Sequence, residues 1–237
     1  NKRTQSMKGM VNAVLRKVAA EGPEGWALLA KPRLPGWLRG PLKDAYSPEI
    51  VKAMEAVHFA GAPLDITVKG DVAVANDTLK GEILPTGSIR LANAGQVSAL
   101  PGFEDGDWWV QDAAAAIPVM IIAPQDGEEI LDMCAAPGGK TMQIAASGAH
   151  VTAVDSSVGR MIRVKENLKR TGLTAKAVTS DAFEFNQGGF DAILLDAPCS
   201  ATGTIRRHPD LPYAKDGSEF QDLIDQQARM IDHALTL

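Results

Sequence analysis

The sequence of 237 residues is poor in thiols and imidazoles, with two cysteines, Cys134 and Cys199, and four histidines. Two cysteines exclude a scaffold built on several disulfides and favour a reducing, cytoplasmic setting. They also argue against a cysteine-rich zinc site, and we expect no metal. No uninterrupted apolar run approaches the ~20 residues of a membrane helix, and the polar, basic N-terminus shows no signal-peptide pattern. We therefore expect no membrane partner.

Charge is unevenly spread along the chain, whose net charge is −5. Residues 1–60 hold ten Lys and Arg against five Asp and Glu, whereas the remainder carries a net charge of about −10. A basic leading segment permits a polyanionic partner, although a solvated basic helix explains the same charge. Hydrophobic residues make up 45% and charged residues 22%, which is typical of a globular chain and not of a disordered one.

The first half of the chain predicts helices followed by short strands. Residues 7–20 repeat apolar side chains at helical spacing, and residues 22–47, with four prolines, predict a linker with short helical turns. A helix from Pro48 to Gly61 is expected, with Ser47 as its N-cap. Apolar segments punctuated by Gly and Pro then predict strands at 64–69, 81–85, 88–93 and 107–112, followed by a helix at 112–123.

From Gly127 onward, apolar strands alternate with helices. Strands are expected at 128–134, 150–155, 175–181 and 190–196, and helices at 140–146, 157–171 and 220–237. Such alternation indicates βαβ units, a parallel sheet and an α/β fold of Rossmann-like type. Ligands of such sheets bind at the carboxyl ends of the strands.

One candidate site is the segment DMCAAPGGKT at 132–141, where a strand ends in a turn with Gly138 and Gly139. Glycines let the backbone approach a ligand, and the following helix offers free N–H groups to an anion. Gly139, Lys140 and Thr141 match the end of a phosphate-binding P-loop, which would indicate an NTPase. The leading glycine of that motif is replaced by Cys134, however, and the G-x-G-x-x-G dinucleotide pattern is absent.

A second feature is an acid at the end of each later strand: Asp155, Asp181 and Asp196. Carboxylates gathered at one sheet edge repel a triphosphate and attract a ligand that carries positive charge. An acid after the second strand also suits ribose hydroxyls. S-adenosylmethionine fits this pattern, with its sulfonium, ammonium, ribose and adenine. The alternative is that each aspartate merely caps the next helix.

A third feature is DAPCSATGTIRRHPD at 196–210, which places Cys199 in a loop directly after a strand. Basic neighbours favour the thiolate form of a cysteine, although a lone cysteine is more commonly a buried structural residue. The basic run is interpreted either as a phosphate contact or as an exposed turn; it comprises Arg206, Arg207 and His208.

These motifs, in this order, resemble the RsmB/Sun (Fmu) family of ribosomal RNA cytosine-5 methyltransferases, and the resemblance covers essentially the whole chain. It implies an incomplete Rossmann-like methyltransferase sheet preceded by a small α+β RNA-binding subdomain. It also implies three parts: residues 1–21 as the end of a NusB-like helical domain, 22–112 as linker and RNA-binding subdomain, and 113–237 as a truncated methyltransferase domain.

The resemblance further implies roles for individual residues. Asp155 binds the ribose of S-adenosylmethionine, Asp181 binds the adenine, and Asp196 lies between the cofactor and the target cytosine of small-subunit ribosomal RNA. The methionine part is embraced by Cys134, Ala135, Ala136, Pro137, Gly138, Gly139 and Lys140.

In this family one cysteine attacks carbon 6 of cytosine, and a second, in a Pro-Cys motif, helps release the product. Cys199 matches the second role. The attacking cysteine belongs to a Thr-Cys-Ser motif on a strand that we expect beyond Leu237, so this piece is expected to bind cofactor weakly at best and to transfer no methyl group. Two alternatives stay open: an RNA- and cofactor-binding fragment without catalysis, and a methyltransferase that uses Cys199 itself as the nucleophile.

Overall fold

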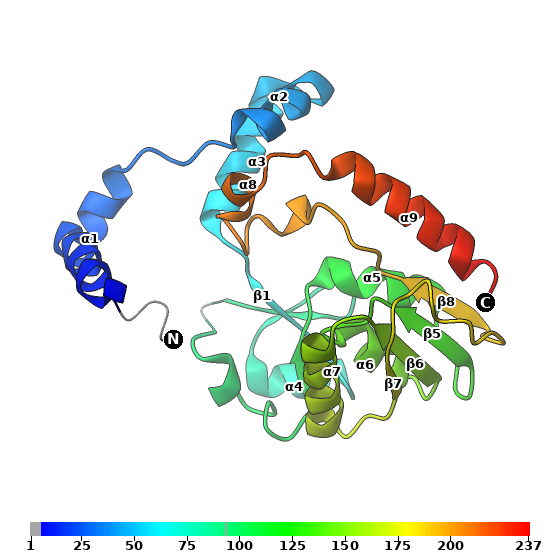
Figure 1. Cartoon of the computed structure of the whole chain (residues 1–237). Coiled ribbons are helices and arrows are strands. Elements are labelled where there is room, and N and C mark those ends of the chain that lie inside the picture. The colour runs from blue at the N-terminus through cyan, green and yellow to red at the C-terminus, as the bar shows by residue number, and fades with distance from the viewer. Residues whose placement is uncertain (1–5, 93) are drawn as a thin grey trace. The chain divides into compact units, whose positions relative to one another are not determined.

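The computed structural model describes residues 6–92 and 94–237, and the chain divides into two compact units (Figure 1). The first unit is formed by Ile205–Ala214 and the described part of Asn1–Gly61. The second is formed by Ala62–Thr204 and Lys215–Leu237. No helix among the described residues is long and apolar enough to cross a membrane.

The first unit is helical. Its third helix begins as predicted, because the N–H of Ile50 donates to Oγ of Ser47 at 3.3 Å and Pro48 occupies the first turn. The helices of this unit are α1 (Lys8–Leu28), α2 (Gly36–Ala45), α3 (Pro48–Ala60) and α8 (Leu211–Ala214).

The predicted linker at 22–47 is wrong in part, since much of it is helical. Helix α1 breaks at Gly22, where φ is 66°, and then continues to Leu28, while α2 fills ten residues of the linker. Pro41 removes one backbone hydrogen bond from α2. Leu38 offsets that loss, because it is buried in a small core with Leu34 and Ile205.

The second unit begins with a four-stranded antiparallel sheet in the order β2-β3-β1-β4. The four predicted strands are confirmed, though each is shorter than expected, and residue 93 at the end of one prediction lies outside the described residues. The strands are β1 (Leu64–Val68), β2 (Glu82–Ile83), β3 (Ile89–Leu91) and β4 (Trp108–Val110). A 3-10 turn, η2 (Val97–Ala99), lies between the last two.

Sequence reasoning missed helix α4 (Val72–Leu79) in this sheet. Asp71 caps it, since the carboxylate Oδ1 accepts from the N–H groups of Ala73 at 2.7 Å and Val74 at 3.1 Å. The helix packs its less exposed side against the core of the sheet, where Ile66, Ile89 and Trp108 are buried.

The second sheet is parallel, with the four predicted strands in the order β7-β6-β5-β8. Its strands are β5 (Glu129–Met133), β6 (His150–Asp155), β7 (Lys176–Thr179) and β8 (Ala192–Leu195). The helices of this part are α5 (Ala113–Ile122), α6 (Gly139–Ala145), α7 (Val158–Thr171) and α9 (Phe220–Ala234), with the 3-10 turn η3 (Thr202–Thr204) after β8. The predicted helices are confirmed, apart from residues at their ends.

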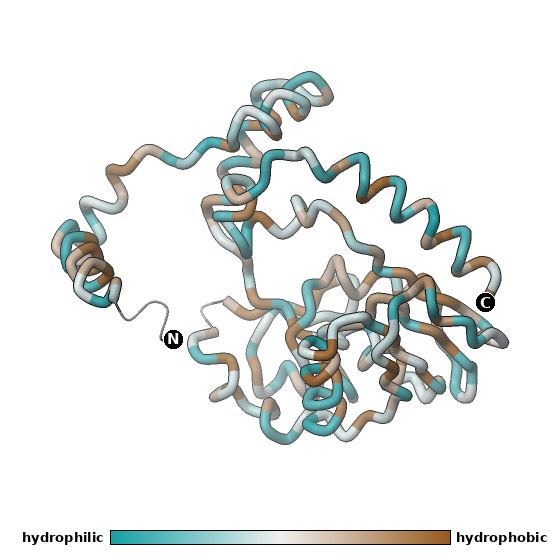
Figure 2. The backbone as a smooth tube through the Cα atoms, in the orientation of Figure 1, coloured by the Kyte–Doolittle hydropathy of each residue, from teal (hydrophilic) through white to brown (hydrophobic). Residues whose placement is uncertain are grey.

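Alternate residues of β5 face opposite sides of the parallel sheet. Ile130 packs toward α5 and α6, whereas Leu131 packs with Phe185 and the end of the chain after α9. Helix α9 shows alternating apolar and polar colour along its length, as expected for a helix with one packed side (Figure 2). The sheet is thus covered on both faces.

The two sheets of this unit are joined at the C-terminal end of α7. The guanidinium of Arg170 donates to the carbonyl oxygens of Phe103 at 2.7 Å and Trp108 at 3.0 Å. The ammonium of Lys69 donates to the carbonyl of Thr171 at 2.8 Å. Gly106 makes this approach possible, because a Cβ there would lie 2.1 Å from the carbonyl oxygen of Arg170.

Candidate functional site

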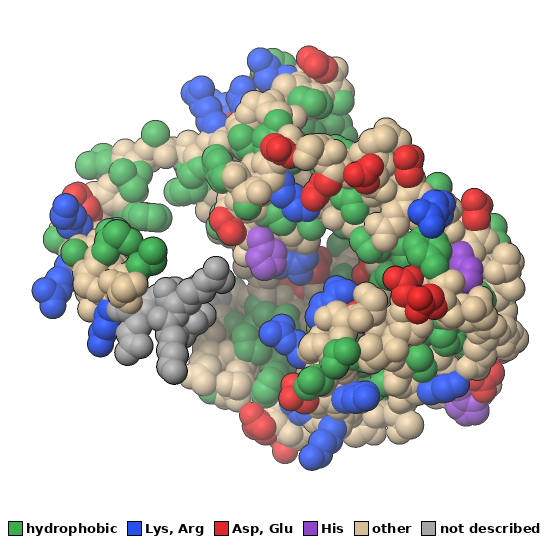
Figure 3. Space-filling model, viewed as in Figure 1, with side chains coloured by type: hydrophobic (Ala, Val, Ile, Leu, Met, Phe, Trp, Pro, Cys, Tyr) green, Lys and Arg blue, Asp and Glu red, His purple; other side chains and the backbone are tan. Residues whose placement is uncertain are grey.

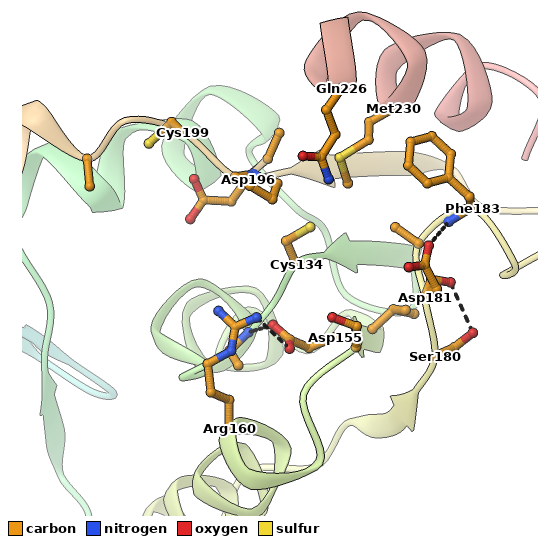
Figure 4. A pocket seen from close by; sticks show the side chains of 17 residues that line it. Cys134, Asp155, Arg160, Ser180, Asp181, Phe183, Asp196, Cys199, Gln226 and Met230 are labelled. Atoms are coloured by element: carbon orange, nitrogen blue, oxygen red, sulfur yellow. Dashed lines mark hydrogen bonds and ion pairs between the residues drawn. The ribbon is translucent and has the colours of Figure 1, made fainter. Parts of the chain in front are cut away.

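The strand order places the candidate site. The chain leaves β5 toward β6 on one side, while β8 is added on the other side of β5, so the loops after β5 and β8 diverge. Open α/β sheets bind ligands in the crevice outside such a switch point. A pocket of about 380 Å³ lies there, lined by the carboxyl ends of the strands and by the exposed start of α7 and one side of α9 (Figure 4).

Asp155 is the most firmly held acid of this pocket. Its side chain is 1% exposed at the end of β6, and the carboxylate accepts from the N–H groups of Ala136 at 3.2 Å and Ser157 at 2.9 Å. The guanidinium of Arg160 lies 3.0 Å from Oδ1 (Figure 4). Three donors thus fix one carboxylate, which lets a buried negative charge persist.

The other two strand-end acids line the same pocket. Oδ1 of Asp181 accepts from the N–H of Phe183 at 2.8 Å in a turn that no helix directly follows, so the alternative that this aspartate caps the next helix is not met. Asp196 is more exposed, and its Oδ2 accepts from the ammonium of Lys140 at 2.8 Å. The structure therefore brings the acids that follow β6, β7 and β8 to one cavity, as their positions at parallel strand ends predict.

The loop after β5 supplies Cys134 and Ala136 to the pocket lining. Gly138 has a φ of 99°, and its bare Cα sits against Val164 of α7, which a Cβ would meet at 3.3 Å. The remaining loop residues named in the sequence analysis support this turn without lining the pocket: Ala135, Pro137, Gly138, Gly139 and Lys140.

Both cysteines line the pocket but differ in environment. Cys134 is half-buried with a φ of 62°, and burial, followed by the nearby charges of Asp155 and Asp196, raises its pKa to about 11. Its thiol is therefore protonated at neutral pH. Cys199 is exposed, in the loop that leaves β8. The structural alternative of a buried Cys199 is thus excluded.

A P-loop does not fit this geometry. The hydroxyl of Thr141, which would have to bind Mg²⁺, is fully buried and donates to Oδ2 of Asp132 at 2.6 Å. Asp132 is itself buried, and burial raises its pKa to about 7, while its Oδ1 has no hydrogen-bond partner among the described residues. Lys140 is committed to Asp196. This acidic surrounding would repel a triphosphate.

The predicted RNA-contact run lies elsewhere. Arg206, Arg207 and His208 belong to the segment of the first unit, and none of them lines the strand-end pocket. Among the described residues, no group of three or more His, Cys, Asp or Glu side chains is arranged to hold a metal ion.

Sequence reasoning missed several pocket residues. Arg160 follows Asp155 by five positions, at the first turn of α7 where Ser157 is the N-cap, and the capping pattern is a signal that could have located it. Gln226 and Met230 come from α9 and Phe183 from the loop after β7 (Figure 4). No local pattern marks these three, because only the folded chain brings them to the strand ends.

Comparisons with known proteins agree with this architecture. The family described as 16S rRNA methyltransferase RsmB/F matches residues 119–237. Ribosomal RNA small subunit methyltransferase B of Cronobacter sakazakii is 41% identical over 245 residues, which is 95% of this chain and 57% of that protein. The chain thus spans somewhat over half the length of the curated relatives it matches.

Solved structures share the fold at lower identity. NSun6 from Pyrococcus horikoshii, solved with SFG, has a TM-score of 0.73 and 19% identity, covering 85% of this chain and 79% of that one. A methyltransferase homologue protein from the same organism has a TM-score of 0.64 and 23% identity, covering 85% of this chain and 72% of that one. From the sequence match over half the chain and the 41% identity across nearly all of it, the chain belongs to the 16S rRNA methyltransferase RsmB/F family.

Proposed function

We propose that the protein containing this chain transfers a methyl group from S-adenosylmethionine to carbon 5 of a cytosine in small-subunit ribosomal RNA. The observation that carries the proposal is the strand-end pocket, where three aspartates and two thiols line one cavity. The names of the curated relatives support ribosomal RNA as the substrate. Cytosine and its carbon 5 are our finer inference from the Pro-Cys loop at Cys199.

The lining of the pocket suits a cationic donor. When bound, S-adenosylmethionine supplies an electrophilic methyl group on a positively charged sulfur. We propose that Asp155 holds the ribose hydroxyls, Asp181 the adenine amino group, and the turn from Cys134 to Lys140 the methionine part. Negative charge at three strand ends would stabilise a cation where water is partly excluded. The protonated thiol of Cys134 adds no further charge.

Thiol chemistry explains why a cysteine belongs beside this pocket. Carbon 5 of cytosine is a poor nucleophile until a thiolate adds at carbon 6. After methylation, a base must remove the proton from carbon 5 before that thiolate leaves. We assign Cys199 to this release step and Asp196 to the space between the cofactor and the base. The target base must be unstacked to enter, which costs least in a single-stranded region of RNA.

We further propose that the 237-residue chain alone transfers no methyl group. Its cysteines are Cys134 and Cys199, and neither matches the attacking residue of the family. A single-turnover assay with labelled cofactor and small-subunit ribosomal RNA tests this directly. Methylation at carbon 5 by the isolated chain would overturn the statement, and would favour Cys199 as the nucleophile.

The role of Cys199 is tested by Cys199→Ser in the complete gene product. If Cys199 serves release, a covalent RNA adduct accumulates and is seen as a band of reduced mobility in a denaturing gel. If it is the attacking residue, all adduct disappears. Cys134→Ser is the comparison variant, because it removes the other thiol of the same pocket and keeps Cys199, so that no adduct should accumulate in it if Cys199 serves release. Absence of cofactor binding by the complete protein would remove the basis of the whole proposal.

We propose that RNA is also contacted by parts of the chain outside the strand-end pocket, which receives the target base. These parts are the subdomain at 22–112 and the basic run of Arg206, Arg207 and His208. In the same proposal, residues 1–21 are the end of a helical domain and residues 113–237 are the catalytic part. Each phosphate contact that is removed should reduce the salt dependence of RNA binding by about 0.7 in the logarithmic slope. Arg207→Gln tests this by titrating affinity against salt, and an unchanged slope argues against a contact.

A further inference from the structure

The first unit contains a pocket of its own, with a volume of about 320 Å³. It is formed by the end of α1, the segment before α2, the end of α3 and the segment 205–213, all within that unit. Its lining includes three aromatic side chains, Trp26, Phe59 and Tyr213, together with Arg33 and Arg206. The family match, at residues 119–237, covers only the lining segment 205–213 of this pocket, and the strand-end pocket shares no lining residue with it.

Exposed aromatic rings are concentrated at this pocket. Among the described residues, the exposed Trp, Tyr and Phe side chains are four, and all lie in the first unit: Trp26, Tyr46, Phe59 and Tyr213. Three of the four line the pocket, with exposed fractions of 56%, 43% and 58% for Trp26, Phe59 and Tyr213. An exposed aromatic ring does not contribute the stabilisation that its burial would give. A cluster of exposed rings therefore indicates a surface that binds a flat, apolar group.

Positive charge surrounds the same rings. Arg33 and Arg206 line the pocket, and the ammonium of Lys31 lies 6.0 Å from the centre of the Phe59 ring. The first unit holds twelve Lys and Arg residues against six Asp and Glu residues, a net charge of +6 in an otherwise acidic chain. Lys and Arg side chains gather around α2 in the space-filling view (Figure 3).

The one acid of the pocket lining is already neutralised. Glu55 is 8% exposed, and its Oε1 accepts from Nε of Arg39 at 2.7 Å and from the N–H of Leu34 at 2.9 Å. Its charge therefore does not repel an anion at the pocket mouth. His58 also lines the pocket, and its buried Nδ1 has no hydrogen-bond partner among the described residues. A polar edge that reached this atom would restore the missing hydrogen bond.

We propose that this pocket holds an unstacked nucleobase of single-stranded RNA between Trp26, Phe59 and Tyr213, with the flanking phosphates beside Arg33 and Arg206. Stacking on aromatic rings next to a basic surface is how proteins bind single-stranded nucleic acid without reading long sequences. The inference rests on the proposed RNA substrate and adds a second contact, in a different unit from the methyl-transfer pocket. A protein segment would be expected to bring acidic side chains to so basic a surface, and it is the competing outcome below.

The test uses the 237-residue chain and a short, fluorescently labelled single-stranded RNA, followed by anisotropy. Trp26→Ala and Phe59→Ala should each weaken binding about tenfold, the usual loss for one stacked base. Tyr46→Ala is the matched control, because Tyr46 is an exposed aromatic of the same unit, 50% exposed, that does not line the pocket. It should change affinity less than about twofold. Equal losses for Trp26 and Tyr46, or no loss for either pocket ring, would overturn the proposal.

A second experiment removes one base of the RNA instead of one aromatic ring of the protein. RNAs that each lack one base are titrated with the wild-type chain and with Trp26→Ala. If the pocket holds a base, one abasic position weakens wild-type binding about tenfold and has little additional effect on the variant. Independent, additive losses contradict the proposal. Circular dichroism of each variant shows that the fold is intact, and the abasic series with the wild-type chain needs no variant at all.

Tryptophan fluorescence distinguishes the competing occupant. Of the four tryptophans of this chain, only Trp26 is exposed, and the difference in acrylamide quenching between the complete gene product and its Trp26→Phe variant reports on this pocket. In the complete gene product without RNA, Trp26 should stay accessible and become shielded when RNA is added. Shielding before RNA is added would show that a protein segment fills the pocket, and would overturn the proposal. None of these readouts needs S-adenosylmethionine, so a failure of the proposed methyl transfer is recognised separately.

Discussion

The guanidinium of Arg160 lies 3.0 Å from Oδ1 of Asp155, and the pair joins an exposed cation on α7 to a carboxylate that is 1% exposed at the end of β6. Without this cation, Asp155 keeps only its backbone donors, the N–H groups of Ala136 and Ser157. The orientation of the carboxylate toward the pocket then loses one charge-assisted hydrogen bond.

Arg160→Ala is therefore expected to weaken binding of S-adenosylmethionine about tenfold, the effect of one hydrogen bond to a charged group. Calorimetry on the complete gene product measures the change. Arg163→Ala is the matched control, since Arg163 is an exposed arginine of the same helix that does not line the pocket. Similar affinities for the two variants would show that Arg160 does not position Asp155.

The two thiols should differ strongly in reactivity. Because burial and the charges of Asp155 and Asp196 raise the pKa of Cys134 to about 11, very little of it is thiolate at pH 8, whereas Cys199 is exposed. We expect iodoacetamide to modify Cys199 first. In Cys199→Ala, the alkylation rate of Cys134 should rise about tenfold per pH unit up to pH 10, as read by mass spectrometry. A rate that levels off near pH 8 would contradict this assignment.

Asp132 should make stability fall as pH rises. Burial raises its folded-state pKa to about 7, while the same carboxyl in the unfolded chain has the ordinary value of about 4. Between these values the native state keeps a proton that the unfolded state has lost, so the free energy of unfolding declines by up to a few kcal/mol and is flat above about pH 7.

Asp132→Asn keeps an oxygen that accepts from the hydroxyl of Thr141 and removes the titrating group. Urea denaturation of both proteins from pH 5 to pH 8 should show a difference in unfolding free energy that grows with pH in favour of the variant. Parallel curves would mean that Asp132 ionises normally in the folded protein.

Two glycines with nearly equal φ values allow the cost of backbone strain to be measured separately from the cost of a steric clash. Gly87 and Gly106 have φ values of 75° and 74°, but a Cβ at Gly87 meets nothing within 4 Å, whereas one at Gly106 meets the carbonyl oxygen of Arg170 at 2.1 Å. Gly87→Ala should cost about 1 kcal/mol through its backbone angle. Gly106→Ala should cost at least about 2 kcal/mol more, because the loop must leave α7. Urea unfolding measures both, and equal costs would contradict the close approach.

The predictable parts of the fold are those with a local signature. Strand periodicity located the eight strands of the described residues, and Ser47 marked the start of α3. Helix α4 was missed because VAVAND alternates like a strand, and only the cap at Asp71 signals a helix. Helix α2 was missed because Pro41 reads as a breaker, while the burial of Leu38 that stabilises it is a tertiary contact.

The residues of the candidate site also divide into those with a local sequence signature and those without one. Acids at successive parallel strand ends must share an edge, so Asp155, Asp181 and Asp196 could be grouped from the sequence. Gln226 lies 30 residues beyond Asp196 on α9, and nothing in its neighbourhood indicates which way that helix folds back. The positive φ of Cys134, which a non-glycine residue seldom adopts, has no sequence signal either.

The contacts of Lys69, Gly106 and Arg170 lie at the C-terminal end of α7 and connect the two sheets of the second unit. Two of them are hydrogen bonds from side chains to backbone carbonyls and the third is the close approach of Gly106, at the far end of the same helix whose first turn carries Arg160. The antiparallel sheet and the strand-end cavity therefore belong to one connected unit. If the proposed RNA substrate contacts that sheet, the protein sets the spacing between this contact and the base that reaches the thiols.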